Sequence, residues 1–509
     1  MTTTPSAAVD LPASRQLVDG AWSEAPVALG IDLENPNTGE VVAQQRASSD
    51  ADVEQAAAAA WREHEAGSWS GLPAEERAAV LESVADAMDA EAMRVAALES
   101  FGTGAPIGTT AMLAAVINGG AFRLVAAQLR EGLLSRTMPG PTGKDAEVHL
   151  LPWGPSLSLV PWNAPGPMAA HKVASSLGAG ATSILKPSEW APYGTTVFAE
   201  VLDRALTEAG VPAGVFQLVQ GGPHVGGSLV NDARVRAVSF TGGLKGGRDI
   251  AAACAPDFKP AQLELGGNNP IVVLDDADLD RAAAGVVDLL TQLNGQWCRA
   301  LGRLLLQETI ADELLTAVLG RLAELRLGDS LSPQTQMGPM VHSRHRDLLQ
   351  SRIDALVALG GTAHATTPLP DDPALAGGNW LAPTLVSGVR SEDATEEIFG
   401  PVASVHTFAT DAEAVALANG TPFGLEGYVF GGDEERAMRL ARQVRAGGVK
   451  VNGSTMLSLN LFAPRPAWGL TGQGEEGTVE TITFFTNPRV VGVENLSAAD
   501  LAALAAAQS

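Results

Sequence analysis

The stretch SLSLVPWNAPGPMAAHKVASSLGAGATSILKPSE, residues 156–189, decides the fold of this 509-residue chain. It contains two β-rich runs, Ser156–Val160 and Thr182–Lys186, with a helical candidate between them. The same alternation continues beyond it, with strand candidates at Val215–Val219 and Ala237–Phe240. Strands that alternate with helices indicate crossover connections and a parallel sheet.

A second series of the same kind follows toward the C-terminus. Its strand candidates are Pro270–Leu274, Gly302–Gln307, Val402–Phe408, Gly427–Phe430 and Val449–Val451. Because each series alternates strands and helices, we expect two α/β halves, joined near residue 266. Upstream of both, residues 17–47 predict short strands and turns, and helices are predicted from Asp50 to about Glu65 and over residues 76–100.

The composition is that of a globular protein with an acidic surface. Hydrophobic residues make up 46% and charged residues 18%, and the length allows about three units of roughly 150 residues. The 33 basic and 58 acidic residues give a net charge of −25, which disfavours nucleic acids and anionic membranes as partners. Met1–Gln16 lacks the apolar core of a secretory signal, and no run approaches the roughly 18 apolar residues of a transmembrane helix.

The chain has only two cysteines, Cys254 and Cys298. Two cysteines make no disulfide framework, and the Cys/His spacing of a zinc site is absent, so no metal site is predicted. A reducing, cytoplasmic location fits this cysteine usage best.

Two motifs carry candidate reactive side chains. Cys298 lies in NGQWCRA, residues 294–300. It is either a buried structural cysteine or a nucleophile, since the nearby glycine permits an unusual backbone approach and Arg299 favours the thiolate. Glu264, in ELGGN, is either a surface acid before a glycine turn or a general base, and spacing alone does not choose.

Polar residues and glycines follow several predicted strands. Pro161-Trp162-Asn163 makes a rigid turn, which is either structural or aims its amide at a developing oxyanion. The runs Lys186 to Glu189 and Thr241-Gly242-Gly243 end two further strands, where ligands bind in open α/β sheets. Glycines there let backbone amides approach a pyrophosphate, although no clean Gly-x-Gly-x-x-Gly fingerprint is present.

Taken together and in this order, the motifs resemble those of the aldehyde dehydrogenase superfamily, from about residue 18 to 490. The separation of Glu264 and Cys298 is typical of that family. The resemblance implies that Cys298 is the nucleophile and that the Asn163 amide and the Cys298 N–H hold the oxyanion. It also implies that Glu264 activates water to hydrolyse the thioester. Lys172 falls where the family usually has a lysine and joins the catalytic set.

The resemblance further implies a nicotinamide dinucleotide cofactor. The residues that would bind it are Trp162, Lys186, Glu189, Thr241, Gly242, Gly243, Glu397 and Phe399. Lys186 and Glu189 look like the ribose-contacting pair, and Glu397 looks like the carboxylate on the nicotinamide ribose. Because a 2′-phosphate would meet the like charge of Glu189, we expect NAD rather than NADP.

The same resemblance places several residues around the aldehyde. They are Ala164, Met168, His171, Trp297 and Arg299, together with Leu293 and the 454–466 loop. Ala164 stands where many relatives carry an aromatic residue, which widens one wall, and Trp297 narrows another. The sequence does not identify the aldehyde; water is the second substrate.

The implied fold class is α/β, with a Rossmann-like cofactor domain, an α/β catalytic domain and a small β oligomerisation arm. The expected division is 1–128 and 153–266 for the cofactor domain, 267–482 for the catalytic domain, 129–152 and 483–495 for the arm, and 496–509 for a C-terminal tail. The run Thr481–Thr486 suits an edge-pairing strand of the arm. Family members are usually dimers or tetramers, so a homodimer or homotetramer is expected.

Several positions depart from the family pattern. The serine common after Thr-Gly is Gly243, the lysine common after Glu-Leu-Gly-Gly is Asn268, and the arginine of a late Gly-x-Gly-Arg-Glu motif is Glu475. None of these removes a catalytic group. Two alternatives to a hydrolytic enzyme remain: a CoA-acylating relative, which would typically lack the base at Glu264, and a catalytically inactive relative with a structural or binding role.

Overall fold

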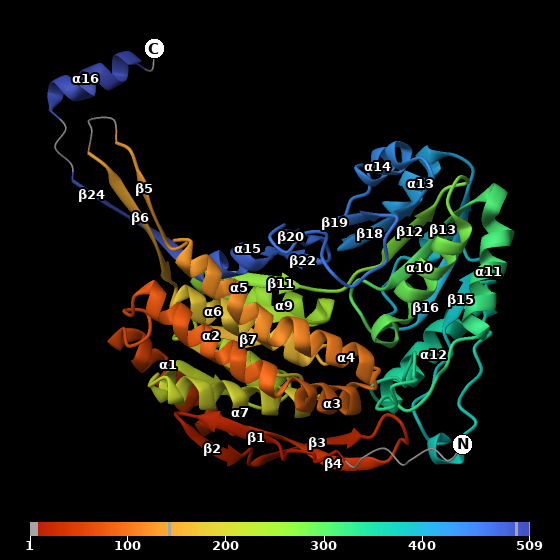
Figure 1. Ribbon diagram of the computed structural model, residues 1–509, viewed down its shortest axis with the longest axis horizontal. Coiled ribbons are helices and arrows are strands. Elements are labelled where there is room, and N and C mark those ends of the chain that lie inside the picture. The colour runs from red at the N-terminus through yellow and green to blue at the C-terminus, as the bar shows by residue number, and fades with distance from the viewer. Residues whose placement is uncertain (1–8, 141–143, 494–496, 508–509) are drawn as a thin grey trace.

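The computed structural model describes residues 9–140, 144–493 and 497–507, which form two lobes and a projecting arm (Figure 1). The first lobe is built on an eight-stranded sheet of order β2-β1-β9-β8-β7-β10-β11-β22. Its strands are β1 Arg15–Val18, β2 Ala21–Glu24, β7 Ser156–Leu159, β8 Ser183–Lys186, β9 Phe216–Leu218, β10 Ala237–Thr241, β11 Ala261–Glu264 and β22 Gly472–Gln473. The strands from β9 to β11 run parallel, which confirms the predicted crossover units.

Helices cover both faces of this sheet. They are α1 Asp50–Ala66, α2 Ala74–Ala90, α3 Ala92–Thr103, α4 Ile107–Leu113, α5 Gly119–Arg130, α6 Pro165–Ala179, α7 Tyr193–Glu208, α8 Pro223–Asn231 and α9 Leu244–Cys254. Successive strand residues point to opposite faces. Leu185 therefore joins the apolar cluster under α6 and α7, and Ile184 joins the one under α1, α8 and α9.

The helices upstream of the sheet differ from the prediction in one respect. α1 begins at Asp50 as predicted, where Ser49 and Asp52 form a capping box. The span 76–100 is not one helix, because the backbone of Glu91 leaves helical geometry (φ −105°, ψ 6°) between α2 and α3.

One helical segment is long and apolar. Ile107–Arg130 joins α4 and α5 through a π-helical turn, η1 Ala114–Asn118, and would be long and apolar enough to cross a membrane by those two criteria alone. Half of its most apolar window is buried inside the protein, as in the core helices of globular proteins.

The second lobe contains a seven-stranded sheet of order β14-β15-β16-β13-β12-β18-β19. Its strands are β12 Asn269–Val273, β13 Leu301–Gln307, β14 Thr362–His364, β15 Thr384–Ser387, β16 Val402–Phe408, β18 Glu426–Phe430 and β19 Gly448–Val451. The helices around it are α10 Leu279–Thr291, α11 Ala311–Ala323, α12 Ser343–Ala358, α13 Asp411–Ala418 and α14 Glu434–Ala441. All five strands predicted for this half are present.

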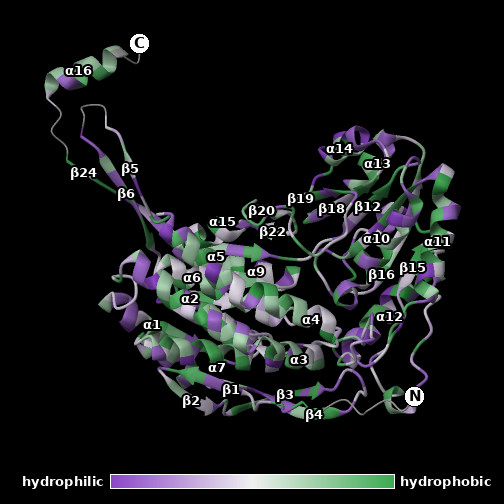
Figure 2. Ribbon diagram, viewed as in Figure 1, coloured by the Kyte–Doolittle hydropathy of each residue, from purple (hydrophilic) through white to green (hydrophobic). Residues whose placement is uncertain are grey.

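The arm is a three-stranded sheet of order β24-β6-β5, with β5 Ser135–Met138, β6 Ala146–Pro152 and β24 Thr486–Gly492. It projects from the first lobe, and α16 Ala498–Ala507 lies beyond its tip (Figure 1). Figure 2 shows apolar residues along β24, where Val490 is 68% exposed.

The predicted edge strand Thr481–Thr486 is wrong. Thr478–Phe484 forms the helix α15, and strand pairing begins only at Thr486, opposite Pro152. Threonine and phenylalanine favour strands, but Ile482 and Phe485 are fully buried in the cluster of the first lobe. Packing of one helical face against α5 and α6 therefore overrides the local preference.

The expected division assigns residues 472–482 to the catalytic domain and residues 483–484 to the arm; in the structure residues 472–484 lie against the first lobe. β22 pairs with β11, and α15 packs on α6. Two short two-stranded ladders lie next to β22 in the chain. One pairs β17 Phe423–Gly424 with β21 Trp468–Gly469, and the other pairs β20 Arg465–Pro466 with β23 Glu475–Glu476. A further hairpin, β3 Val27–Glu34 with β4 Val41–Ala47, lies upstream. Parts of the predicted cofactor domain, arm and tail, namely residues 1–8, 141–143, 494–496 and 508–509, lie outside the described residues.

Candidate active site

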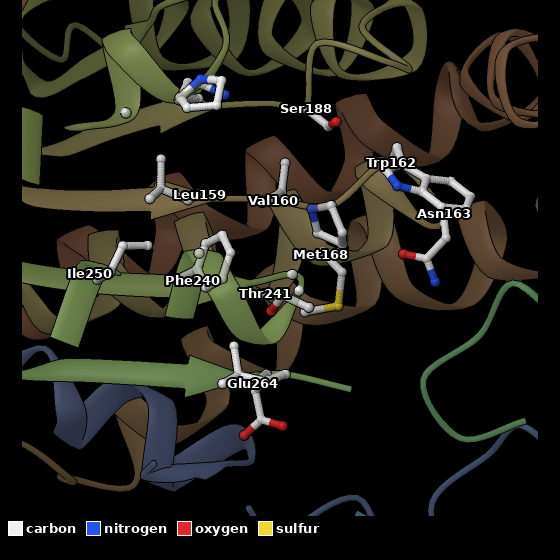
Figure 3. Close-up of a pocket in the computed structure, with 18 of the residues that line it drawn as sticks. Leu159, Val160, Trp162, Asn163, Met168, Ser188, Phe240, Thr241, Ile250 and Glu264 are labelled. Carbon is white, nitrogen blue, oxygen red and sulfur yellow. The ribbon is translucent and has the colours of Figure 1, made fainter. Parts of the chain in front are cut away.

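A cavity of about 710 Å³ opens at the carboxyl ends of the parallel strands of the first lobe. The strand order reverses between β7 and β10, and such switch points are where open α/β sheets bind ligands. Figure 3 shows Val160, Thr241 and Glu264 at this edge of the sheet. Cys298, Asn163 and Glu397 line the same cavity, so one space collects residues from both lobes.

The loop before Cys298 has a constrained backbone. Leu293, Asn294 and Gly295 all have positive φ angles, of 50°, 59° and 69°. A Cβ on Gly295 would lie 2.3 Å from the backbone nitrogen of Pro401, so only glycine fits. The Asn294 amide donates to the carbonyls of Gly104 and Pro339, which fixes the turn that presents Cys298.

Asn163 is tied to the nucleophile loop across the cavity. Its Nδ2 donates to the Gln296 carbonyl over 2.9 Å. One amide hydrogen remains for an oxyanion, because an asparagine Nδ2 carries two. Asn269 Nδ2 in turn donates to the Cys298 carbonyl over 2.8 Å, so the backbone on both sides of the cysteine is fixed.

The Cys298 thiol is protonated at neutral pH in this arrangement. Burial raises its pKa to about 12; Arg299 opposes that shift, and the carboxyl groups of Glu264, Glu397 and Glu476 add to it. Arg299 does not favour the thiolate as strongly as the sequence suggested, because its guanidinium is bound to Glu426 of β18. Proton removal is therefore a step that the site must perform.

Glu264 ends β11 with its side chain buried and its Oε1 without a hydrogen-bond partner among the residues described. Burial, assisted by Glu476, raises its pKa well above the ordinary value, and Lys172 opposes the shift. Once ionised, a desolvated carboxylate of this kind is a stronger base than an exposed one.

Lys172 lies beneath the cavity rather than in its lining. Its Nζ donates to Ser239 Oγ over 2.7 Å and is 3.4 Å from Glu476 Oε1. Burial lowers the pKa of Lys172. Burial alone would raise the pKa of Glu476, but Lys172, with smaller contributions from its neighbours, lowers it to about 2. Lys172 and Glu476 thus form a buried ion pair within electrostatic range of Glu264.

The predicted cofactor residues all line the cavity. Lys186 Nζ donates to the Pro187 carbonyl over 2.9 Å and is 3.8 Å from Glu189 Oε2. Gly243 caps α9, whose first N–H groups have no side-chain partner, and Thr241 Oγ1 is buried and unpartnered among the residues described. An exposed helix N-terminus beside an unsatisfied hydroxyl fits a diphosphate.

The other wall of the cavity belongs to the second lobe. Glu397 Oε1 accepts from Gly267 N over 2.8 Å, and burial raises the Glu397 pKa to about 7. Phe399 has a positive φ of 29°, and its ring lies 5.4 Å from that of Trp162, edge to face. His345 Nε2 donates to the Phe399 carbonyl over 3.0 Å and helps hold this strained residue.

The predicted substrate residues separate into two groups. Ala164, Met168 and Trp297 line the cavity. His171 does not: it is half-buried, its Nε2 is 3.0 Å from Thr481 Oγ1, and desolvation lowers its pKa to about 4. Arg299 is likewise absent from the lining, because it pairs with Glu426.

Three residues near the site were missed from the sequence. Glu476 pairs with Lys172, and its signal was its place in the late Gly-x-Gly motif. His345 lines the cavity, but no motif marks it. Arg465 lies opposite Glu476 in the β20–β23 ladder and was treated only as part of a loop. Among the described residues, no group of three or more His, Cys, Asp or Glu could hold a metal ion.

Comparison with known proteins gives consistent matches over nearly the whole chain. The model of the aldehyde dehydrogenase family matches residues 22–491. The chain is 33% identical over 486 residues to a betaine aldehyde dehydrogenase of Rhizobium leguminosarum bv. trifolii (strain WSM2304), covering 95% of this chain and 97% of that protein. It is 36% identical over 448 residues to the 5-carboxymethyl-2-hydroxymuconate semialdehyde dehydrogenase of Escherichia coli, covering 86% and 94%. A betaine aldehyde dehydrogenase point mutant from Staphylococcus aureus, solved in complex with NAD⁺, matches with a TM-score of 0.88 at 30% identity, covering 95% and 98%.

Proposed function

This chain belongs to the aldehyde dehydrogenase family, and we propose that it oxidises an aldehyde to the free carboxylic acid with NAD, through a thiohemiacetal and a thioester on Cys298. The observation that carries the proposal is the single cavity that collects Cys298, Glu264 and Asn163 with the strand-end residues suited to a dinucleotide.

In the first step Cys298 gives its thiol proton to solvent water in the cavity, and the Sγ thiolate attacks the aldehyde carbon. The second Asn163 amide hydrogen and the Cys298 N–H stabilise the oxyanion. Bound NAD supplies the acceptor for the hydride that leaves the same carbon as the thioester forms. Phe399, Trp162 and Glu397 would hold the nicotinamide half of that cofactor, and Lys186, Glu189 and the Thr241–Gly243 turn the adenosine half.

In the second step water replaces the sulfur. Glu264 removes the water proton, the carbon–sulfur bond breaks, and the products are the carboxylic acid and the Cys298 thiol. The unpartnered Oε1 and the apolar surroundings of Glu264 support this role, because a desolvated carboxylate is a stronger base.

The decisive experiment compares the two cysteines. Cys298→Ala should abolish NADH formation with a panel of aldehydes while NAD binding and thermal unfolding stay unchanged. Cys254→Ala is the matched control, because Cys254 is buried in α9 and lies outside the cavity lining. Residual turnover of Cys298→Ala within tenfold of the parent would show that Cys298 is not the nucleophile.

Adding CoA to the same assay separates the alternatives. We expect the free acid as product, with or without CoA. Release of acyl-CoA would identify an acylating enzyme, and a lack of turnover with every aldehyde tested would identify an inactive relative.

We further propose that the first lobe is the cofactor domain and that the second lobe is the catalytic domain. The arm would pair subunits into a homodimer or homotetramer in the cytoplasm. The exposed edge and valines of β24 support the assembly.

A further inference from the structure

Arg465 is a charged group beside the catalytic cluster that the mechanism above does not use. It lies on β20, directly opposite Glu476 on β23, and its side chain is 32% exposed. Its nearest acidic atom is Glu476 Oε2, at 3.8 Å. Within the described parts of the chain, no hydrogen bond to the guanidinium is found, although a guanidinium has five donors in a planar fork.

Arg465 shares its acidic partner with a second cation. Glu476 Oε1 is paired with Lys172 Nζ at 3.4 Å, and Glu476 Oε2 is the atom that faces Arg465. One carboxylate therefore faces two cations, and Arg465 is the cation that reaches solvent. Arg465 stands directly opposite Glu476, which is paired with Lys172 under the cavity, so its guanidinium lies beside this buried ion pair rather than in the cavity lining itself.

The segment that leads to Arg465 is apolar. Leu457, Leu459, Leu461 and Phe462 are 53%, 76%, 56% and 50% exposed. The segment is held on both sides of the site: Lys450 Nζ donates to the carbonyls of Thr455 and Leu457, and Thr478 Oγ1 donates to that of Leu461. Met456 packs on the same apolar cluster as Trp297, Ala164 and Cys298.

From this juxtaposition we propose that the substrate is an aliphatic aldehyde with a carboxylate at its far end, and that Arg465 binds that carboxylate. The inference rests on the proposed function and specifies its substrate class. The apolar segment would contact the carbon stem, and the planar fork of Arg465 matches a carboxylate in two parallel hydrogen bonds. A carboxylate from the substrate would give each of the two cations an anionic partner. Arg465 is then a specificity-determining residue, distinct from the groups that perform the chemistry.

The kinetic test uses matched substrates: pentanal against 5-oxopentanoate, and butanal against 4-oxobutanoate. The parent should prefer the carboxylated member of at least one pair. Arg465→Gln should lower kcat/KM for that member about 30-fold or more, mainly through KM, because hydrogen bonds to charged groups contribute about 1.5–3 kcal/mol. It should change the neutral member less than about threefold. Arg465→Lys should recover part of the loss, and Arg439→Gln, on the exposed face of α14, is the matched control.

A binding test separates this inference from the proposed function. Calorimetry on Cys298→Ala, which cannot turn over, compares glutarate with pentanoate, the products of the five-carbon pair. Glutarate should bind more tightly, and adding Arg465→Gln should remove the difference. Equal binding of the two acids, or equal kinetic losses for charged and neutral aldehydes, would overturn the inference while leaving aldehyde oxidation intact. Arg465-dependent binding of glutarate by a protein that oxidises no aldehyde would uphold the anion site and reject the proposed function.

Discussion

Glu264 ends its strand with one carboxylate oxygen that no described residue satisfies, and this predicts how the enzyme fails without it. Glu264→Gln keeps the shape of the side chain and removes the carboxylate that acts as the base. A burst of about one NADH per site should remain, and steady-state turnover should fall by about 10²–10⁴-fold. Stopped-flow absorbance measures both phases. If the burst also disappears, Glu264 takes the thiol proton as well; turnover like that of the parent would contradict its role in hydrolysis.

The same residue predicts a pH dependence. Burial raises the Glu264 pKa, so the ionised base forms only as the pH rises through that raised value. Where hydrolysis limits turnover, kcat of the parent should therefore increase with pH over a range that begins above the ordinary glutamate value of 4.5. Glu264→Gln should lose this slope. A kcat that falls with pH over that range would show that a different group limits the reaction.

Cofactor choice depends on Glu189 at the next strand end. Its carboxylate would repel the 2′-phosphate of NADP, and Lys186 at 3.8 Å softens that repulsion. The parent should have a higher kcat/KM with NAD than with NADP, and Glu189→Gln should lower the ratio of these two values about tenfold. Equal values for the two cofactors in the parent would refute the assignment.

At the scale of elements, α6 depends on a buried acid at its start. Glu99 of α3 is fully buried and accepts the Gly166 N–H in the first turn of α6, just after Asn163 and Ala164. Burial raises the Glu99 pKa to about 8. Because an unfolded glutamate titrates near 4.5, the folded chain binds more protons between these values. The contribution of Glu99 to the free energy of unfolding is therefore largest below about pH 4.5 and declines as the pH rises toward 8.

Glu99→Gln should remove that decline. The amide still accepts from Gly166, and its new N–H can reach toward Asn118, whose side-chain atoms have no partner among the described residues. We expect Glu99→Gln to raise the free energy of unfolding at pH 8.5 by an amount on the order of a few kcal/mol relative to its effect at pH 5.5. Thermal unfolding at the two pH values measures it, with Glu91→Gln at the start of the same helix as the control. An equal pH dependence in both variants would contradict the prediction.

Elements were predictable where local pattern and packing agree. The short apolar runs gave the parallel strands of both sheets, because a buried strand must be apolar on both faces. Thr481–Thr486 failed, because its strand-forming residues are buried on one side of a helix. Motifs likewise identified the predicted cofactor residues, all of which line the cavity, but no motif marked His345. They could not show that Arg299 pairs with Glu426 or that Arg465 shares Glu476 with Lys172, because such pairings join elements far apart in sequence.

At the scale of the whole molecule, the arm predicts assembly. Val490 is 68% exposed on a strand with a free edge, a combination that isolated proteins avoid. Val490→Lys should lower the mass measured by light scattering toward that of a single chain. Val27→Lys, at a 44% exposed valine on β3, should not. An unchanged mass in Val490→Lys would place the subunit contacts elsewhere.

The late strand β22 also constrains how the protein is made. It pairs with β11, with Gly472 opposite Glu264, so the catalytic base is flanked by a segment that leaves the ribosome long after its own strand. During synthesis the β11 edge of the first-lobe sheet therefore has no partner strand until most of the second lobe has been translated. A nascent chain halted before residue 472 should therefore remain protease-sensitive around β11, and the two lobes should mature as one cooperative unit rather than in succession.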